Sequence, residues 1–97
     1  MPKAYIVTTY RSISNPDVFA EYAKLAAPAM IAAGGRFLAR GNAVKAYEKG
    51  VTQRVVVLEF DSVEKAVAAF DGPAYQAALK VLGNTAERDI RIVEAVA

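Results

Sequence analysis

The segment from Gln53 to Phe60 (QRVVVLEF) carries the strongest structural signal in this chain. Its run of branched aliphatic residues predicts a β-strand. Because side chains alternate along a strand, Val56 and Leu58 point to one face and Val55 and Val57 to the other. A strand that is apolar on both sides needs a covering layer on each face of its sheet. The fold must therefore place two layers against this strand.

The first third of the chain predicts a strand followed by a helix. Ala4 to Tyr10 (AYIVTTY) is rich in β-branched and aromatic residues, which is typical of a strand. Asn15 followed by Pro16 is a favourable helix start, and apolar residues continue at helical spacing to Ala33. Pro28 falls inside this helix and is expected to bend it or split it in two.

A double glycine, Gly34–Gly35, is expected to end this helix and lead directly into a strand that begins at Arg36. We expect an interruption near Gly41 and a resumption over Val44 to Tyr47, before a turn into Gln53–Phe60. The two strands then make a hairpin. On a regular strand the alternation of side chains places Arg36, Leu38 and Arg40 on one face and Phe37 and Ala39 on the other.

Two short helices and a last strand complete the chain. The helices are predicted from Val63 to Phe70 and from Pro73 to Leu82, the first of them capped by Asp61 or Ser62. Residues 89–96 (DIRIVEAV) alternate as a strand does. This order of elements predicts an α+β, ferredoxin-like βαββαβ fold, with a four-stranded antiparallel sheet in the order 4-1-3-2 and the helices on one face.

The helices of such a fold leave one face of the sheet bare, although its central strands are apolar on both sides. The simplest cover for that face is the same face of a second copy, so we expect a homodimer. The 97 residues are expected to form one domain, residues 1–97, which is a size at which a partner subunit helps stability.

Composition excludes several kinds of chemistry. Twelve basic and ten acidic residues are interspersed along the chain, which argues against nucleic acid or a membrane as partner. With no cysteine and no histidine, thiol nucleophiles, Ser-His-Asp triads and histidine-ligated haem are excluded, and we expect no metal and no cofactor. The sequence has no signal-peptide pattern and no apolar run of roughly 18 residues, so we expect a cytoplasmic protein.

Four segments, placed in this order of elements, resemble one known family: Gly34–Gly41 (GGRFLARG), Arg54–Phe60 (RVVVLEF), Tyr75–Gln76 and Ile92–Glu94. The chain resembles a family of small bacterial proteins known only as a domain of unknown function, within the dimeric α+β barrel superfamily. The resemblance implies a ferredoxin-like protomer whose sheet packs against that of its twin. The superfamily includes cofactor-independent oxygenases, haem-degrading enzymes, dye-decolorising peroxidases and lactone isomerases. Their histidine- and tryptophan-dependent sites do not map onto this chain, which contains neither residue.

The charged residues of the predicted strands have two interpretations. Arg36, Arg40 and Arg54 are expected to lie near Glu59 and Glu94 in the barrel interior, where they would satisfy one another as ion pairs. Alternatively, one arginine stays free and binds a carboxylate or phosphate. Glu59 itself is either a general base with a raised pKa or a partner of an arginine, and we favour the pairing.

Two tyrosines complete the candidate site. Tyr22 and Tyr75 lie on helix faces that should look toward the sheet, where they are either core residues or phenolic donors in a pocket. Two main hypotheses for function follow. The chain binds a small anionic or aromatic metabolite between sheet and helices, with a cofactor-independent oxygenase or isomerase activity as an alternative. Otherwise it is a structural or regulatory dimer without a ligand.

Overall fold

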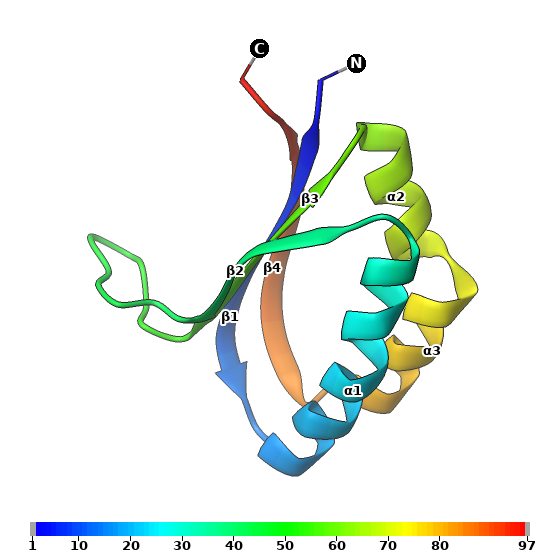
Figure 1. Cartoon of the computed structure of the whole chain (residues 1–97). Coiled ribbons are helices and arrows are strands. Elements are labelled where there is room, and N and C mark those ends of the chain that lie inside the picture. Colours follow the sequence, from blue (N-terminus) through cyan, green and yellow to red (C-terminus); the bar gives the residue numbers. More distant parts are fainter. Residues whose placement is uncertain (1, 97) are drawn as a thin grey trace.

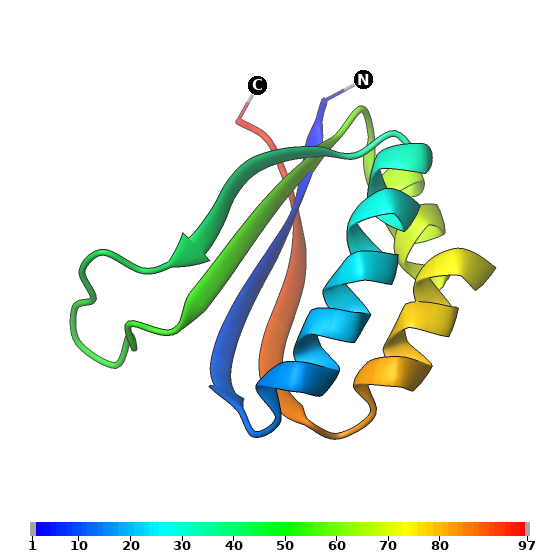
Figure 2. The same cartoon turned by 60° about the horizontal axis from the view of Figure 1, so that its bottom comes forward.

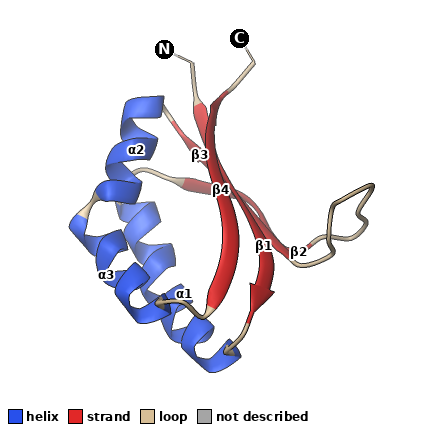
Figure 3. Cartoon of the chain, turned by 180° about the vertical axis from the view of Figure 1, so that it is seen from behind, coloured by secondary structure: helices blue, strands red, loops and turns tan. Residues whose placement is uncertain are grey.

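The computed structural model, which describes residues 2–96, confirms the predicted ferredoxin-like fold (Figure 1). Its strands pair antiparallel in the order β2-β3-β1-β4, which is the predicted order read from the other edge. Within residues 2–96, helices α1, α2 and α3 pack on one face of this sheet and leave the other face bare (Figure 3). The elements in chain order are β1 (Ala4–Ile13), α1 (Pro16–Ala32), β2 (Arg36–Asn42), β3 (Arg54–Phe60), α2 (Val63–Asp71), α3 (Pro73–Leu82) and β4 (Ala86–Glu94).

Helix α1 begins and ends as the sequence predicts, but it is not split. The Asn15 side chain accepts a hydrogen bond from the Val18 N–H at 3.2 Å and caps the first turn. Pro28 leaves the Lys24 carbonyl without its helical donor. Because Pro28 and Lys24 are both exposed, water can bond that carbonyl, and the helix continues unbroken to Ala32.

The turn from α1 into β2 depends on its two glycines. Gly34 has a φ of +98°, a conformation that favours glycine. Its N–H donates to the Ile31 carbonyl at 3.0 Å, and the Gly35 N–H donates to the Met30 carbonyl at 2.9 Å. A Cβ at Gly35 would lie 2.7 Å from the ring of Phe60. Only glycine therefore lets the helix end pack this closely on β3.

The predicted continuation of β2 over Val44 to Tyr47 is wrong. β2 ends at Asn42, and residues 43–53 form a loop that projects from the sheet (Figure 2). The last link between the two chain segments is the bond from the Ala43 N–H to the Gln53 carbonyl, at 3.1 Å. Val44 beyond it is fully exposed and packs against nothing that would hold an extended strand in place. A turn with Glu48 at a φ of +51° closes the loop.

The hydrophobic core lies between the sheet and the helices. β1 and β3 contribute alternate residues to it, including Ile6, Leu58 and the fully buried Phe60. Ser62, and not Asp61, caps α2, because its hydroxyl accepts a hydrogen bond from the Lys65 N–H at 3.2 Å. Among residues 2–96, no helix is long and apolar enough to cross a membrane.

Candidate functional site

A β-bulge in β2 separates arginines that the sequence places together. The pairing with β3 shifts between Phe37 and Ala39, so that Leu38 is an extra residue in the strand. Phe37 lies opposite the inward-facing Leu58, and Arg40 lies opposite the inward-facing Val56. The predicted common face for Arg36, Leu38 and Arg40 is therefore wrong. Arg40 points toward the helices, and Arg36 points away from them.

Arg36 joins an ion-pair cluster on the bare face of the sheet. Its guanidinium lies 2.9 Å from a Glu59 carboxylate oxygen and 3.0 Å from Asp61, and the Lys3 ammonium lies 3.6 Å from Glu59. The hydrogen bond from Arg36 lowers the pKa of Glu59 below its ordinary value, which is opposite to the raised pKa expected of a general base. Within residues 2–96, Glu94 forms no ion pair, so the predicted network reduces to the Arg36–Glu59 pair.

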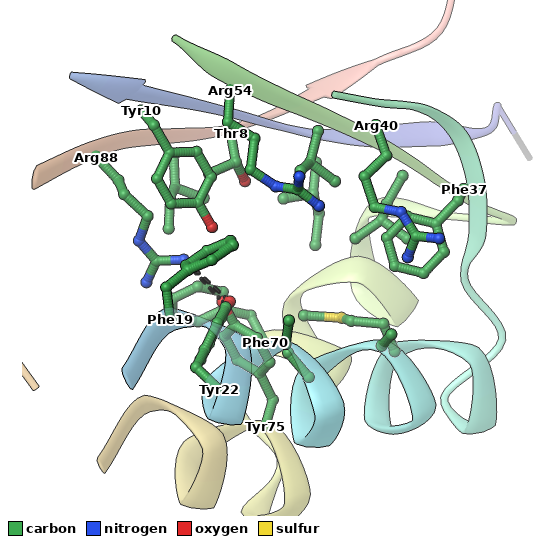
Figure 4. Close-up of a pocket in the computed structure, with 18 residues that line it drawn as sticks. Thr8, Tyr10, Phe19, Tyr22, Phe37, Arg40, Arg54, Phe70, Tyr75 and Arg88 are labelled. Atoms are coloured by element: carbon green, nitrogen blue, oxygen red, sulfur yellow. Dashed lines mark hydrogen bonds between the residues drawn. The ribbon is translucent and has the colours of Figure 1, made fainter. Parts of the chain in front are cut away.

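A cavity lies on the other face, between α1 and the sheet (Figure 4). Its volume is about 550 Å³ with the solvent at its mouth, and about 60 Å³ of this can hold the centre of a water molecule. Aliphatic and aromatic side chains line most of it. The polar side chains that reach it are Thr8, Tyr10, Tyr22, Arg40, Arg54, Tyr75 and Arg88, with no aspartate or glutamate among the lining residues.

Arg54 enters the cavity from the first residue of β3. Its guanidinium carbon lies 5.2 Å from the centre of the Phe19 ring. The Nε–H is buried and has no hydrogen-bond partner among the described residues. The guanidinium carbon of Arg40 lies 4.4 Å from the centre of the Phe37 ring. Within residues 2–96, neither arginine has a carboxylate within 4.0 Å, so each presents a charge that nothing described neutralises.

A second polar centre joins the two helices to β4. The hydroxyl groups of Tyr22 and Tyr75 lie 2.6 Å apart, and Nη1 of Arg88 donates to them at 3.0 and 3.3 Å respectively (Figure 4). Burial, together with the neighbouring Tyr75, raises the pKa of Tyr22 above its ordinary value. Burial opposes the charge of Arg88, but the oxygens of the two tyrosines outweigh it and raise its pKa. At neutral pH this centre therefore holds Tyr22 as a neutral phenol beside the guanidinium cation of Arg88.

The cavity brings together four of the six residues that the sequence suggests for ligand binding: Tyr22, Arg40, Arg54 and Tyr75. Arg36 and Glu59 lie on the opposite face. Sequence reasoning missed Arg88. The signal was present, since Arg88 alternates in phase with Ile90 and Ile92, but it lies before residue 89, where the predicted strand begins. In residues 2–96, no three potential metal-ligating side chains come together.

Comparison with known sequences gives the family. Residues 3–96 match the family described as a domain of unknown function, DUF1330. The chain belongs to the DUF1330 family. No curated protein matches this DUF1330 chain.

Solved structures share the fold of this DUF1330 chain at low sequence identity. A protein of unknown function from Rhodopseudomonas palustris is 16% identical over 99% of this chain and 84% of its own, with a TM-score of 0.73. A dimeric ferredoxin-like protein of unknown function from Thermobifida fusca is 19% identical over 97% and 92%, with a TM-score of 0.69. SnoaB, a cofactor-independent oxygenase from Streptomyces nogalater, is 13% identical over 100% and 96%, with a TM-score of 0.67. At these identities the likeness shows the fold alone.

Proposed function

We propose that this protein binds a small organic anion in the cavity between α1 and the sheet. The observation that carries the proposal is the buried Arg54 Nε–H, which has no partner among the described residues, in a cavity lined by no carboxylate. Buried polar groups of proteins are almost always hydrogen-bonded, and an unpaired one costs free energy. A carboxylate that accepts from Arg54 would satisfy both its hydrogen-bonding capacity and its charge.

The dimensions of the cavity limit the ligand. The space of about 60 Å³ corresponds to roughly four to six water positions, at about 10–15 Å³ each. A short organic acid fits that space, with its carboxylate at Arg54. Aliphatic side chains such as Ile6, Met30 and Val56 also line the cavity and would contact the carbon atoms of the ligand.

Binding is favoured over catalysis because the cavity holds no ordinary general base. Its lining contains no aspartate, glutamate or lysine, and the chain has no histidine. The phenols are the remaining proton-transfer groups, and burial raises the pKa of Tyr22. Within residues 2–96, Arg40 and Arg54 also make none of the ion pairs that a purely structural role would require of them.

A thermal-shift titration with formate, acetate, propionate and benzoate tests the proposal. We expect the wild type to gain stability with a short carboxylate, by RT ln(1 + [L]/Kd) at free ligand concentration [L]. Arg54→Met should lose this gain. Lys24→Met is the control, because Lys24 is exposed on α1, lies outside the cavity lining and the bare face, and pairs with Glu21 at 3.4 Å. Equal shifts in all three proteins, or no shift in the wild type, would overturn the proposal.

We further propose that the protein is a homodimer formed through the bare face of the sheet. Val7 and Val57 lie opposite each other at the centre of that face and are partly exposed. Burying them against a second copy would remove an apolar surface from water. The dimeric ferredoxin-like protein from Thermobifida fusca shares this fold and supports the proposal. A single domain over residues 1–97 and a cytoplasmic location stay predictions.

A further inference from the structure

The polar centre formed by Tyr22, Tyr75 and Arg88 leaves one phenolic hydrogen without an acceptor among the described residues, and this hydrogen bears on the identity of the ligand. Each phenolic oxygen has one hydrogen to give and two lone pairs. If Tyr75 donates across the 2.6 Å contact, the Tyr22 oxygen accepts from both Tyr75 and Arg88, and its own hydrogen is left over. If Tyr22 donates instead, the hydrogen of Tyr75 is left over in the same way. In either arrangement one phenolic hydrogen has no acceptor among the described residues.

The cavity therefore presents two donor centres from different layers of the fold. Arg54 extends from the sheet, and the two phenolic hydroxyls approach from the helices (Figure 4). A simple carboxylate has oxygen atoms at one end and can satisfy one centre. A ligand with an additional oxygen can satisfy both, because the free phenolic hydrogen needs only an oxygen lone pair as its acceptor.

We propose that the ligand is a short oxo or hydroxy carboxylic acid, bound with its carboxylate at Arg54 and its second oxygen at the centre formed by Tyr22, Tyr75 and Arg88. This inference rests on the proposed function and adds the substrate class. Burial raises the pKa of Tyr22, so this phenol keeps its hydrogen at physiological pH. No bond is made or broken, and the centre determines selectivity.

Isothermal titration with pyruvate and isobutyrate tests the proposal. These anions have the same number of non-hydrogen atoms and a similar shape, and they differ in whether the second carbon carries an oxygen or a methyl group. We expect the wild type to bind pyruvate about tenfold more tightly than isobutyrate, as expected for one or two additional hydrogen bonds. Lactate should also bind more tightly than isobutyrate.

Tyrosine variants then identify the centre. Tyr22→Phe and Tyr75→Phe should each retain the preference for pyruvate, because removing one hydroxyl frees the hydrogen of the other. The double variant should bind both anions equally. Thr8→Val is the control, since Thr8 is a buried hydroxyl residue that lines the same cavity. If Thr8→Val and not the double variant removes the preference, the second oxygen lies elsewhere and the assignment is wrong.

A measurement on the wild type keeps the proposal testable if the double variant does not fold. With ¹³C-labelled tyrosine, assigned through the two single variants, the ring signals of Tyr22 and Tyr75 should shift more with pyruvate than with isobutyrate. Equal shifts would overturn the proposal. Equal affinity for both acids, with binding still dependent on Arg54, would refute the substrate class and leave the anion site standing. Failure of every acid to bind would refute both.

Discussion

Arg36 and Arg40 lie four positions apart on β2, yet their side chains are on opposite faces of the sheet. The bulge at Leu38 causes this, because an extra residue reverses the alternation of every side chain that follows it. Arg36 can therefore pair with Glu59, while Arg40 reaches the cavity. Because Arg36 is ion-paired on the bare face and Arg40 lines the cavity, substitutions at the two positions should have different consequences.

We expect Arg36→Met to lower stability at neutral pH and to weaken the dependence of stability on acid pH. Hydrogen bonds from Arg36 hold the pKa values of Glu59 and Asp61 below their ordinary range. Between the folded and unfolded pKa values, the unfolded chain binds more protons, so stability rises with pH there. The contribution is fully present above the ordinary carboxylate pKa of about 4 and is lost as pH falls through the folded pKa. Urea unfolding from about pH 3 to pH 7 measures this slope.

Lys80→Met is the control for that experiment. Lys80 is exposed on α3, and among residues 2–96 it makes no ion pair, so its removal should leave the slope as in the wild type. If Arg36→Met and the wild type show the same slope, the cluster does not influence acid stability in solution.

The order of elements was predictable because local signals agree with the fold. Asn15–Pro16, Gly34–Gly35 and Gly72–Pro73 mark helix ends, and the alternation in β3 defines a central strand. The bulge was not predictable. The bulge depends on the register between β2 and β3, which is a tertiary property. Leucine, the residue at position 38, is also not a residue type that indicates a bulge. For that reason the sequence alone could not place Arg36 and Arg40 on opposite faces of the sheet.

Gly35→Ala is expected to lower the free energy of unfolding by about 1–3 kcal/mol. The added Cβ would lie 2.7 Å from Cζ of the fully buried Phe60 and 3.0 Å from the Met30 carbonyl oxygen. Chemical denaturation of the two single variants and of Gly35→Ala with Phe60→Leu checks the cause. The smaller side chain at residue 60 should relieve the clash, so the double variant should lose less stability than the sum of the single losses. Additive losses would show that the contact with the Met30 carbonyl, and not with the Phe60 ring, makes glycine necessary.

The cavity was only partly visible in the sequence. Tyr22 and Tyr75 lie 53 positions apart, and nothing in either helix indicates that their hydroxyls meet. Arg54 was identified as one of three arginines on adjacent predicted strands. The pairing of the strands places Glu59 and Asp61 beside Arg36. For this reason Arg54 has no carboxylate partner among the described residues, and the sequence alone could not show this.

Arg54→Met should leave the free energy of unfolding unchanged or raise it by up to about 1 kcal/mol. The variant loses the contact with Phe19, worth about 0.5–1 kcal/mol, and it also removes a buried donor that has no partner among the described residues. Urea unfolding without added ligand makes the measurement. A loss of several kcal/mol would mean that Arg54 has a structural partner, which would weaken the case for an anion site.

The proposed dimer interface can be tested at Val57, on the bare face of the sheet. Val57 faces away from the helices at the centre of the sheet and lies opposite Val7 on β1. If a second copy covers this face, Val57→Lys places a charge in an apolar interface and should convert the dimer to a monomer. Val67→Lys on the exposed side of α2 adds the same charge outside the interface and should leave the dimer intact. Light scattering at micromolar concentration distinguishes the two masses. A monomeric wild type, or a Val57→Lys variant that stays dimeric, would mean that the bare face is not the interface.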